Sequence, residues 1–138
     1  MSENKFRQVT DELYEILKDE VPEIANWKQE VLGPAYPKEL TGFICCDTVE
    51  YAPFSKGMRE ATAVYTIEII CPNPKGREQD TTPVEDLAMK VKDVLAGNET
   101  LDGWAKSSFV DKIVFGTPAG QSSSIGIAVF SFTVTFLE

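Results

Sequence analysis

The sequence predicts a single α+β domain over residues 1–138, in which two helices pack on one face of an antiparallel sheet of four or five strands. Two segments carry apolar residues at helical spacing, and at least four others alternate apolar with polar residues as strands do. Their order is helix, one or two strands, strand, helix, strand, strand, without an internal repeat or a domain linker. A sheet covered by helices on one face buries all of these apolar surfaces.

The first segment, residues 3–20, predicts an amphipathic helix. Its apolar residues recur mainly at intervals of three and four: Phe6, Val9, Leu13, Ile16 and Leu17. Ser2 is suited to the N-cap because its hydroxyl oxygen can accept a hydrogen bond from a free backbone N–H. Pro22 biases Val21 away from helical geometry, so we expect the helix to end near Glu20.

The next segments predict a strand with irregular chain on both sides. Residues 24–32 fit either a strand or an extended arm, and residues 33–37 hold a turn with two prolines and a glycine. Residues 42–51 alternate as a strand. We expect residues 52–57 to break that strand because they contain Pro53 and two further turn-forming residues.

Residues 59–71 are the clearest strand before the second helix. The face expected to point to the core carries Tyr65, Ile67, Ile69 and Cys71, and the other carries Val64, Thr66, Glu68 and Ile70. A compact link joins this strand to residues 42–51, which predicts an antiparallel hairpin. The polar residues 72–80 that follow predict a loop, which is a candidate contact arm.

The second helix has the best local signature in the chain. Thr82 is placed as the N-cap, Pro83 as the first helical residue and Glu85 as the capping-box acid. Gly97 is placed to end the helix in a left-handed conformation. The expected apolar stripe is Val84, Leu87, Ala88, Val91, Val94 and Leu95.

Two strands are expected after this helix, at residues 107–116 and 125–137. The loop between them, residues 116–124, is rich in glycine and serine; it lacks a phosphate-binding motif and precedes a strand, not a helix. In the last strand one face is apolar and the other carries hydroxyls: Phe130, Phe132, Val134 and Phe136 alternate with Ser131, Thr133 and Thr135. Trp27 and Trp104 lie in segments of weak periodicity and fit either core packing or exposed interface anchors.

The residue content excludes most catalytic chemistry. The chain has no histidine, which removes Ser-His-Asp and Cys-His nucleophile systems and histidine zinc motifs. Cys45, Cys46 and Cys71 are expected to be reduced and buried, with Cys45 and Cys46 on opposite faces of their strand. Asp47 and Glu50 are expected on opposite faces too, as solvated surface. We therefore expect no catalytic residue, no cofactor site and no metal site.

The net charge, the apolar runs and the N-terminal pattern limit the kinds of partner that are expected. The net charge is −9, and the densest basic stretch is residues 75–77, so the chain is not expected to bind nucleic acid tightly. No apolar run reaches the length of about 20 residues that crosses a bilayer, so no membrane is expected as a partner. The acidic, amphipathic N-terminus does not have the pattern of a secretory signal, which predicts synthesis inside the cell.

The whole-chain pattern resembles the tail-terminator, or tail-completion, proteins of long-tailed bacteriophages and prophages. The resemblance runs over nearly the whole chain. It rests on the order and spacing of four elements. An N-terminal helix comes first, and a middle strand then follows a glycine and a basic residue. A second helix comes after a polar loop and is followed by a short motif, and a strand of alternating apolar residues is last. These segments read KFRQVTDELYEILKDEV, KGMREATAVYTIEIIC, PVEDLAMKVKDVLAG, LDGW and IAVFSFTVTFLE.

The resemblance implies a structural protein. Proteins of this family form a ring, typically of six subunits, on the end of the tail tube. The ring stops tube polymerisation and presents the surface that joins a head-completion or connector protein. It implies location in the virion tail or neck after synthesis in the bacterial cytoplasm, with DNA passing through the ring. Another head–tail connector or neck protein, and a small-molecule or peptide-binding module, are the alternatives; an enzyme is disfavoured.

Overall fold

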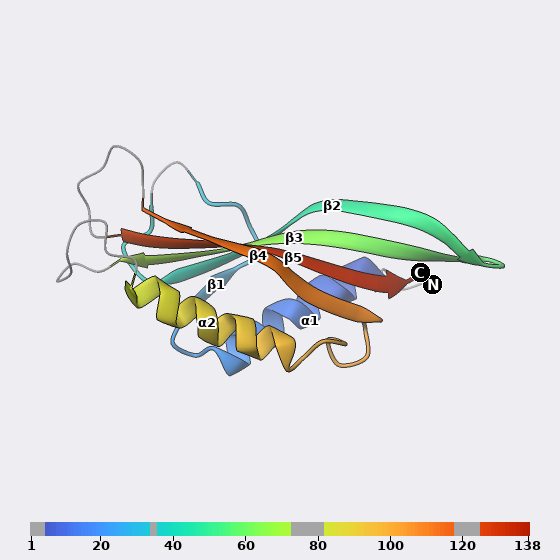
Figure 1. Cartoon of the computed structure of the whole chain (residues 1–138), viewed down its shortest axis with the longest axis horizontal. Coiled ribbons are helices and arrows are strands. Elements are labelled where there is room, and N and C mark those ends of the chain that lie inside the picture. The colour runs from blue at the N-terminus through green and yellow to red at the C-terminus, as the bar shows by residue number, and fades with distance from the viewer. Residues whose placement is uncertain (1–4, 34–35, 73–81, 118–124) are drawn as a thin grey trace.

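The structure is a computed structural model that describes residues 5–33, 36–72, 82–117 and 125–138. In chain order it contains α1 (Lys5–Glu20), β1 (Asn26–Lys28), β2 (Thr41–Ser55), β3 (Met58–Pro72), α2 (Thr82–Ala96), β4 (Ser107–Gly116) and β5 (Ile125–Leu137). Both helices lie on the same side of one sheet (Figure 1). The α+β class and the placement of the helices are confirmed.

The sheet has five strands in the order β1-β2-β3-β5-β4. Three of the four strand pairs are antiparallel, but β1 runs parallel to β2 and pairs with its residues 41–43. The sheet is therefore mixed, which corrects the expectation of a purely antiparallel one. The chain between β1 and β2 spans residues 29–40, and a connection of about a dozen residues is what a parallel pair needs. Of the ambiguous residues 24–32, only three form a strand.

The core lies between the helices and the inner face of the sheet. The helices contribute the buried side chains Val9, Leu13, Ile16, Leu17, Val84, Ala88, Val91 and Leu95. Phe6, Leu87 and Val94, also expected in the apolar stripes, are partly buried against this core. The two helical periodicities are therefore confirmed.

The central strands β3 and β5 alternate as expected. On β3, Tyr65, Ile67 and Ile69 are fully buried, while Cys71 at the strand end is half-buried. On β5, the inward residues Phe130, Phe132, Val134 and Phe136 are fully buried. Period-two burial occurs on both strands because only their inner face is covered by helices.

The strand β2 is longer than the sequence suggests. It continues through Ser55, so residues 52–55 extend the strand instead of breaking it. Pro53 pairs with Arg59 of β3 in the register. A proline can occupy an edge strand because the N–H that it lacks can face away from the neighbouring strand. The break falls only at residues 56–57, where Gly57 has a φ of 77°.

A β-bulge at Asp47 reverses the facing of the residues that follow it. The register shifts between Cys46 and Thr48, so Val49 lies opposite Ala63 on the inner face instead of the outer one. Glu50 lies opposite Thr62 on the outer face. A one-residue insertion changes the face of every later side chain, and simple alternation could not reveal it.

The end of α2 also differs from expectation. Gly97 does not adopt a left-handed conformation; positive φ occurs instead at Leu101, Asp102 and Gly103 in the turn that follows. The Nδ2 of Asn98 donates to the carbonyl of Val94 at 2.8 Å and so satisfies one of the last helical carbonyls. A side-chain cap therefore takes the place of the glycine cap.

Both tryptophans pack against the core. Trp27 of β1 is 5% exposed and lies over Gly42, whereas Trp104 is half-buried at the edge of the core. The core-packing alternative is thus the correct one for Trp27. Ser2 and most of the loops at 72–80 and 116–124 lie outside the described residues.

A buried hydrogen bond joins α1 to the sheet. The hydroxyls of Thr10 and Tyr65 lie 2.7 Å apart, and the Thr10 hydroxyl also donates to the carbonyl of Phe6 at 3.0 Å. Burial raises the pKa of Tyr65, which keeps its phenol neutral. The ring of Phe6 stacks on Tyr65 with centroids 6.3 Å apart. One polar contact and one aromatic contact therefore fix the position of the helix.

We predict that Thr10→Val lowers the free energy of unfolding by about 1–2 kcal/mol, because it preserves shape but leaves the buried Tyr65 hydroxyl without this partner. Urea unfolding measures the change. Tyr65→Phe is the comparison, and its cost is expected to be smaller because Thr10 keeps its bond to Phe6. Equal costs for the two variants would contradict this asymmetry.

Candidate assembly surface

The tip of the β2–β3 hairpin projects past the end of the sheet (Figure 1). We call residues 51–59 the hairpin arm. Tyr51, Phe54 and Met58 are 50%, 51% and 39% exposed on it. Phe54 lies where the register shifts between Pro53 and Ser55, which leaves it without a cross-strand partner. Exposed aromatic side chains on a projecting element are typical anchors of protein interfaces.

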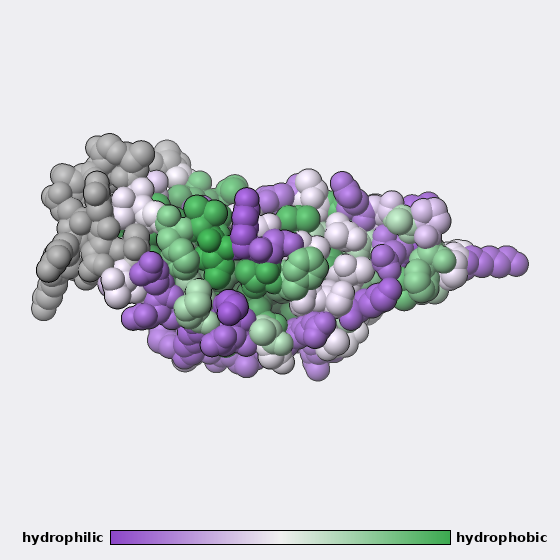
Figure 2. Space-filling model, in the orientation of Figure 1, coloured by the Kyte–Doolittle hydropathy of each residue, from purple (hydrophilic) through white to green (hydrophobic). Residues whose placement is uncertain are grey.

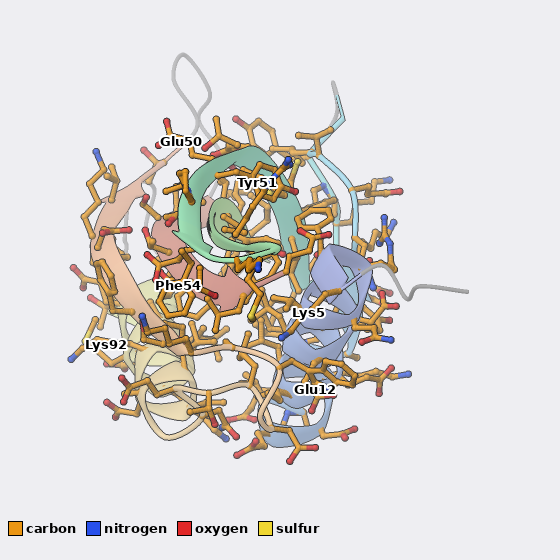
Figure 3. All side chains as sticks on the ribbon, turned by 90° about the vertical axis from the view of Figure 1, so that its right-hand side faces the viewer. Lys5, Glu12, Glu50, Tyr51, Phe54 and Lys92 are labelled. Carbon is orange, nitrogen blue, oxygen red and sulfur yellow. The ribbon has the colours of Figure 1, made fainter. Side chains whose placement is uncertain are left out.

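The hairpin arm is basic in an acidic protein. Residues 51–59 contain Lys56 and Arg59 and no acidic residue, although the whole chain has a net charge of −9. In Figure 3 the hairpin curls over the end of the sheet and carries Tyr51 and Phe54. The Nζ of Lys106 lies 5.3 Å from the centre of the Phe54 ring and 2.9 Å from Glu60. The arm thus combines apolar and cationic groups.

An apolar groove runs between the C-terminal half of α2 and the start of β4. Its volume is about 320 Å³, and it is lined by Lys92, Leu95, Ala96, Glu99, Ser108, Phe109, Val110 and Phe132. Phe109 is 55% exposed. Hydrophobic residues gather over the course of β4 in Figure 2, and Val114 on the same strand is also exposed. This groove is large enough to hold a phenyl ring.

An acidic hollow adjoins the groove at the end of α2 and shares Ala96 and Glu99 with it. Among the residues that the structure describes, its lining contains six carboxylates and no lysine or arginine: Glu12, Glu15, Asp19, Glu20, Glu99 and Asp102. The last residues of both helices, Glu20 and Ala96, lie here as well. Helix C-termini carry partial negative charge, so this region repels further anions and attracts cations.

The acidic hollow raises the pKa of one of its carboxyl groups, that of Glu12. Partial burial raises the pKa of Glu12, and the carboxylates of Asp102, Glu15 and Asp19 raise it further. Within the described part of the chain, no lysine or arginine in the lining balances the negative charge of the hollow.

Both long edges of the sheet carry a bulge with an aspartate. The extra residues are Asp47 in β2 and Asp111 in β4. Asp47 accepts a hydrogen bond from Thr66, and Asp111 accepts one from Thr133, both at 2.5 Å. Bulges and charges on edge strands oppose flat edge-to-edge pairing. Extension of the sheet is therefore not the favoured way to join copies of this chain.

A second apolar hollow lies on the outer face of the sheet. It has a volume of about 320 Å³ and is lined by Glu30, Val31, Leu32, Phe43, Cys45, Asp47, Thr66 and Glu68. Burial raises the pKa of Glu68. Phe43 is buried although it faces outward, because the chain after β1 crosses this face (Figure 1). The volume is at the lower limit of small-ligand sites.

The candidate catalytic groups of the sequence do not converge. Cys45 and Cys46 face opposite sides of β2, and all three cysteines are half-buried and free, whereas they were expected to be fully buried. Burial raises the thiol pKa of Cys46 and of Cys71, and Asp47 raises that of Cys46 further, which disfavours the reactive thiolate.

The expected facing of Asp47 and Glu50 is wrong. Both lie on the outer face because Asp47 is itself the extra residue of the bulge, which reverses the facing of the residues after it. Asp47 accepts a hydrogen bond from the Thr66 hydroxyl, which occupies one of its carboxylate oxygens. Among the residues that the structure covers, no three histidine, cysteine or carboxylate side chains are grouped to hold a metal ion. Within the same residues, no helix is both long enough and apolar enough to span a membrane.

Comparison with known proteins finds no matching family model and no matching curated protein. The sequence pattern points to the loop at 72–80 as a contact arm, which lies almost wholly outside the described residues, and does not single out the hairpin arm. The available signal was Lys56-Gly57 between two alternating runs, which is typical of a tight hairpin turn. Pro53 had favoured a break at this place instead.

Proposed function

We propose that this chain is a structural assembly subunit that acts as a phage or prophage tail terminator. It forms a ring, of six subunits, on the end of the tail tube, stops tube polymerisation and provides the surface for a head-completion or connector protein. In this proposal the protein belongs to the virion tail or neck. DNA passes through the ring without tight binding, as suits a chain with a net charge of −9.

The single observation that supports assembly most is the hairpin arm. A monomer that works alone does not need two half-exposed aromatic rings, Tyr51 and Phe54, on an element that projects from its core. The terminator assignment within this class comes from the resemblance in element order. A connector or neck protein would share the same assembly surface.

A binding module is the less favoured candidate. Its support is the hollow on the outer face, which is small and bordered by Glu30, Asp47 and Glu68. Asp47 is already engaged by Thr66, so few polar groups remain to orient a ligand. The hairpin arm has no role in that function.

We predict that the purified protein has a solution mass near six times 15.3 kDa and shows a central hole by electron microscopy. Light scattering over a range of concentrations measures the mass. Added to polymerising subunits of a phage tail-tube protein, the chain is expected to shorten the tubes and to sit at one end.

Bovine serum albumin at equal concentration is the control for non-specific crowding of the tube reaction. A chain that stays monomeric and also leaves tube length unchanged would contradict the proposal. A ring that forms but leaves the tubes unaffected would support another neck protein in its place.

A further inference from the structure

We propose that the hairpin arm of one copy docks head to tail into the groove between α2 and β4 of a second copy, with its basic residues against the acidic hollow. This inference rests on the proposed function only in that both require self-assembly. It identifies the two surfaces that meet, which neither the ring nor the resemblance specifies.

The apolar parts of the two surfaces match in kind. The arm offers Phe54, 51% exposed, and Phe109 of β4, 55% exposed, borders the groove. Within one copy these residues do not bury each other, since both remain about half exposed. A second copy can bury both rings at once. Burying two such rings supplies a large apolar contact at low cost in conformational freedom.

The charges are complementary as well. Two copies with a net charge of −9 each repel one another in general. The arm is the exception because it carries Lys56 and Arg59 without an acidic residue. The acidic hollow has six carboxylates, next to the groove, and Glu99 lines both. Lys92 is the one cation that lines the groove within the described ranges of the chain. Arm-to-hollow contact therefore places cations beside carboxylates that otherwise face one another.

The positions of the surfaces determine the symmetry. The arm continues β2, and the groove borders β4, which is the last strand at the other side of the sheet. Figure 3 shows Tyr51 and Phe54 on the curled hairpin and Lys92 projecting from α2. A contact between two different surfaces repeats from copy to copy, and it closes into a ring when the rotation between copies permits.

Mixing two defective variants tests this arrangement. Phe54→Ala removes the arm anchor and Phe109→Ala removes the groove anchor, so each variant alone is expected to associate about 30-fold more weakly. In an equal mixture, the intact arm of the Phe109→Ala variant can dock into the intact groove of the Phe54→Ala variant. It is therefore expected to give a dimer of twice 15.3 kDa by light scattering, with no larger species. Circular dichroism checks that both variants fold.

A charge exchange provides the second test. Lys56→Glu and Glu99→Lys are each expected to weaken association about tenfold or more, and the double variant is expected to restore it. Val114→Ala is the control, because Val114 is also exposed on β4 but does not line the groove. Higher salt is expected to weaken the wild-type multimer.

The possible failures are distinguishable. A multimer that persists in both phenylalanine variants, or a mixture that behaves like its separate components, overturns the docking arrangement and leaves the ring standing. A wild-type chain that remains monomeric at every concentration also overturns it. Arm-dependent association without any effect on tail tubes supports the docking arrangement and refutes the terminator function.

Discussion

Phe130→Ala is expected to lower the free energy of unfolding by about 3–5 kcal/mol, the largest loss from a single substitution among those proposed. Phe130 is fully buried on the central strand β5. It lies between Ile67 of β3 and Ile113 of β4 in the register, beneath the helices. Alanine removes the apolar contacts and also leaves a cavity that rigid neighbours cannot fill. The free energy of the lost contacts and the cost of the cavity therefore add.

Urea or guanidinium unfolding followed by circular dichroism measures this loss. Val114→Ala is the control, since Val114 is 53% exposed on the neighbouring strand and is expected to change stability by no more than about 0.5 kcal/mol. A cost below about 1 kcal/mol for Phe130→Ala would mean that the space between sheet and helices is not closely packed.

Gly42→Ala is expected to cost up to about 3 kcal/mol, although it adds only one methyl group. A Cβ at position 42 would lie 2.4 Å from the Cε3 and Cζ3 atoms of the Trp27 ring. Trp27 pairs with Gly42 across the parallel strands and is buried, so its ring has little room to move. Displacing the ring exposes the indole to water, and its fluorescence is expected to shift to longer wavelength.

Gly33→Ala is the matched control for this substitution. Nothing lies within 4 Å of a Cβ at Gly33, and its φ is not in the left-handed region, so the change is expected to be close to neutral. In a Trp27→Leu background the cost of Gly42→Ala is expected to fall, because the clashing ring is gone. An undiminished cost would refute the proposed contact.

Much of the fold follows from local patterns. The stripe on each helix and the alternation of β5 match burial because a helix face and a strand face each repeat with a fixed period. The end of α1 near Pro22 and the limits of β4 follow from local chemistry in the same way. Each of these features depends on residues that are close in the chain.

Only a small part of the candidate assembly surface could be predicted from the sequence. Phe54 and Phe109 are unremarkable in sequence, and their exposure depends on which elements cover them. The six described carboxylates of the acidic hollow come from α1 and from the turn after α2. Segments so far apart in the chain become neighbours only after the helices pack side by side.

The sequence by itself determined the helices, the hairpin of the two middle strands and the absence of histidine chemistry, because these depend on composition and short-range patterns. Only the tertiary structure decided the parallel β1, the bulges at Asp47 and Asp111 and the continuation of β2 past Pro53. Backbone pairing between distant strands governs these features. The energy of such pairing can outweigh a local preference, and a single inserted residue then redirects every side chain beyond it.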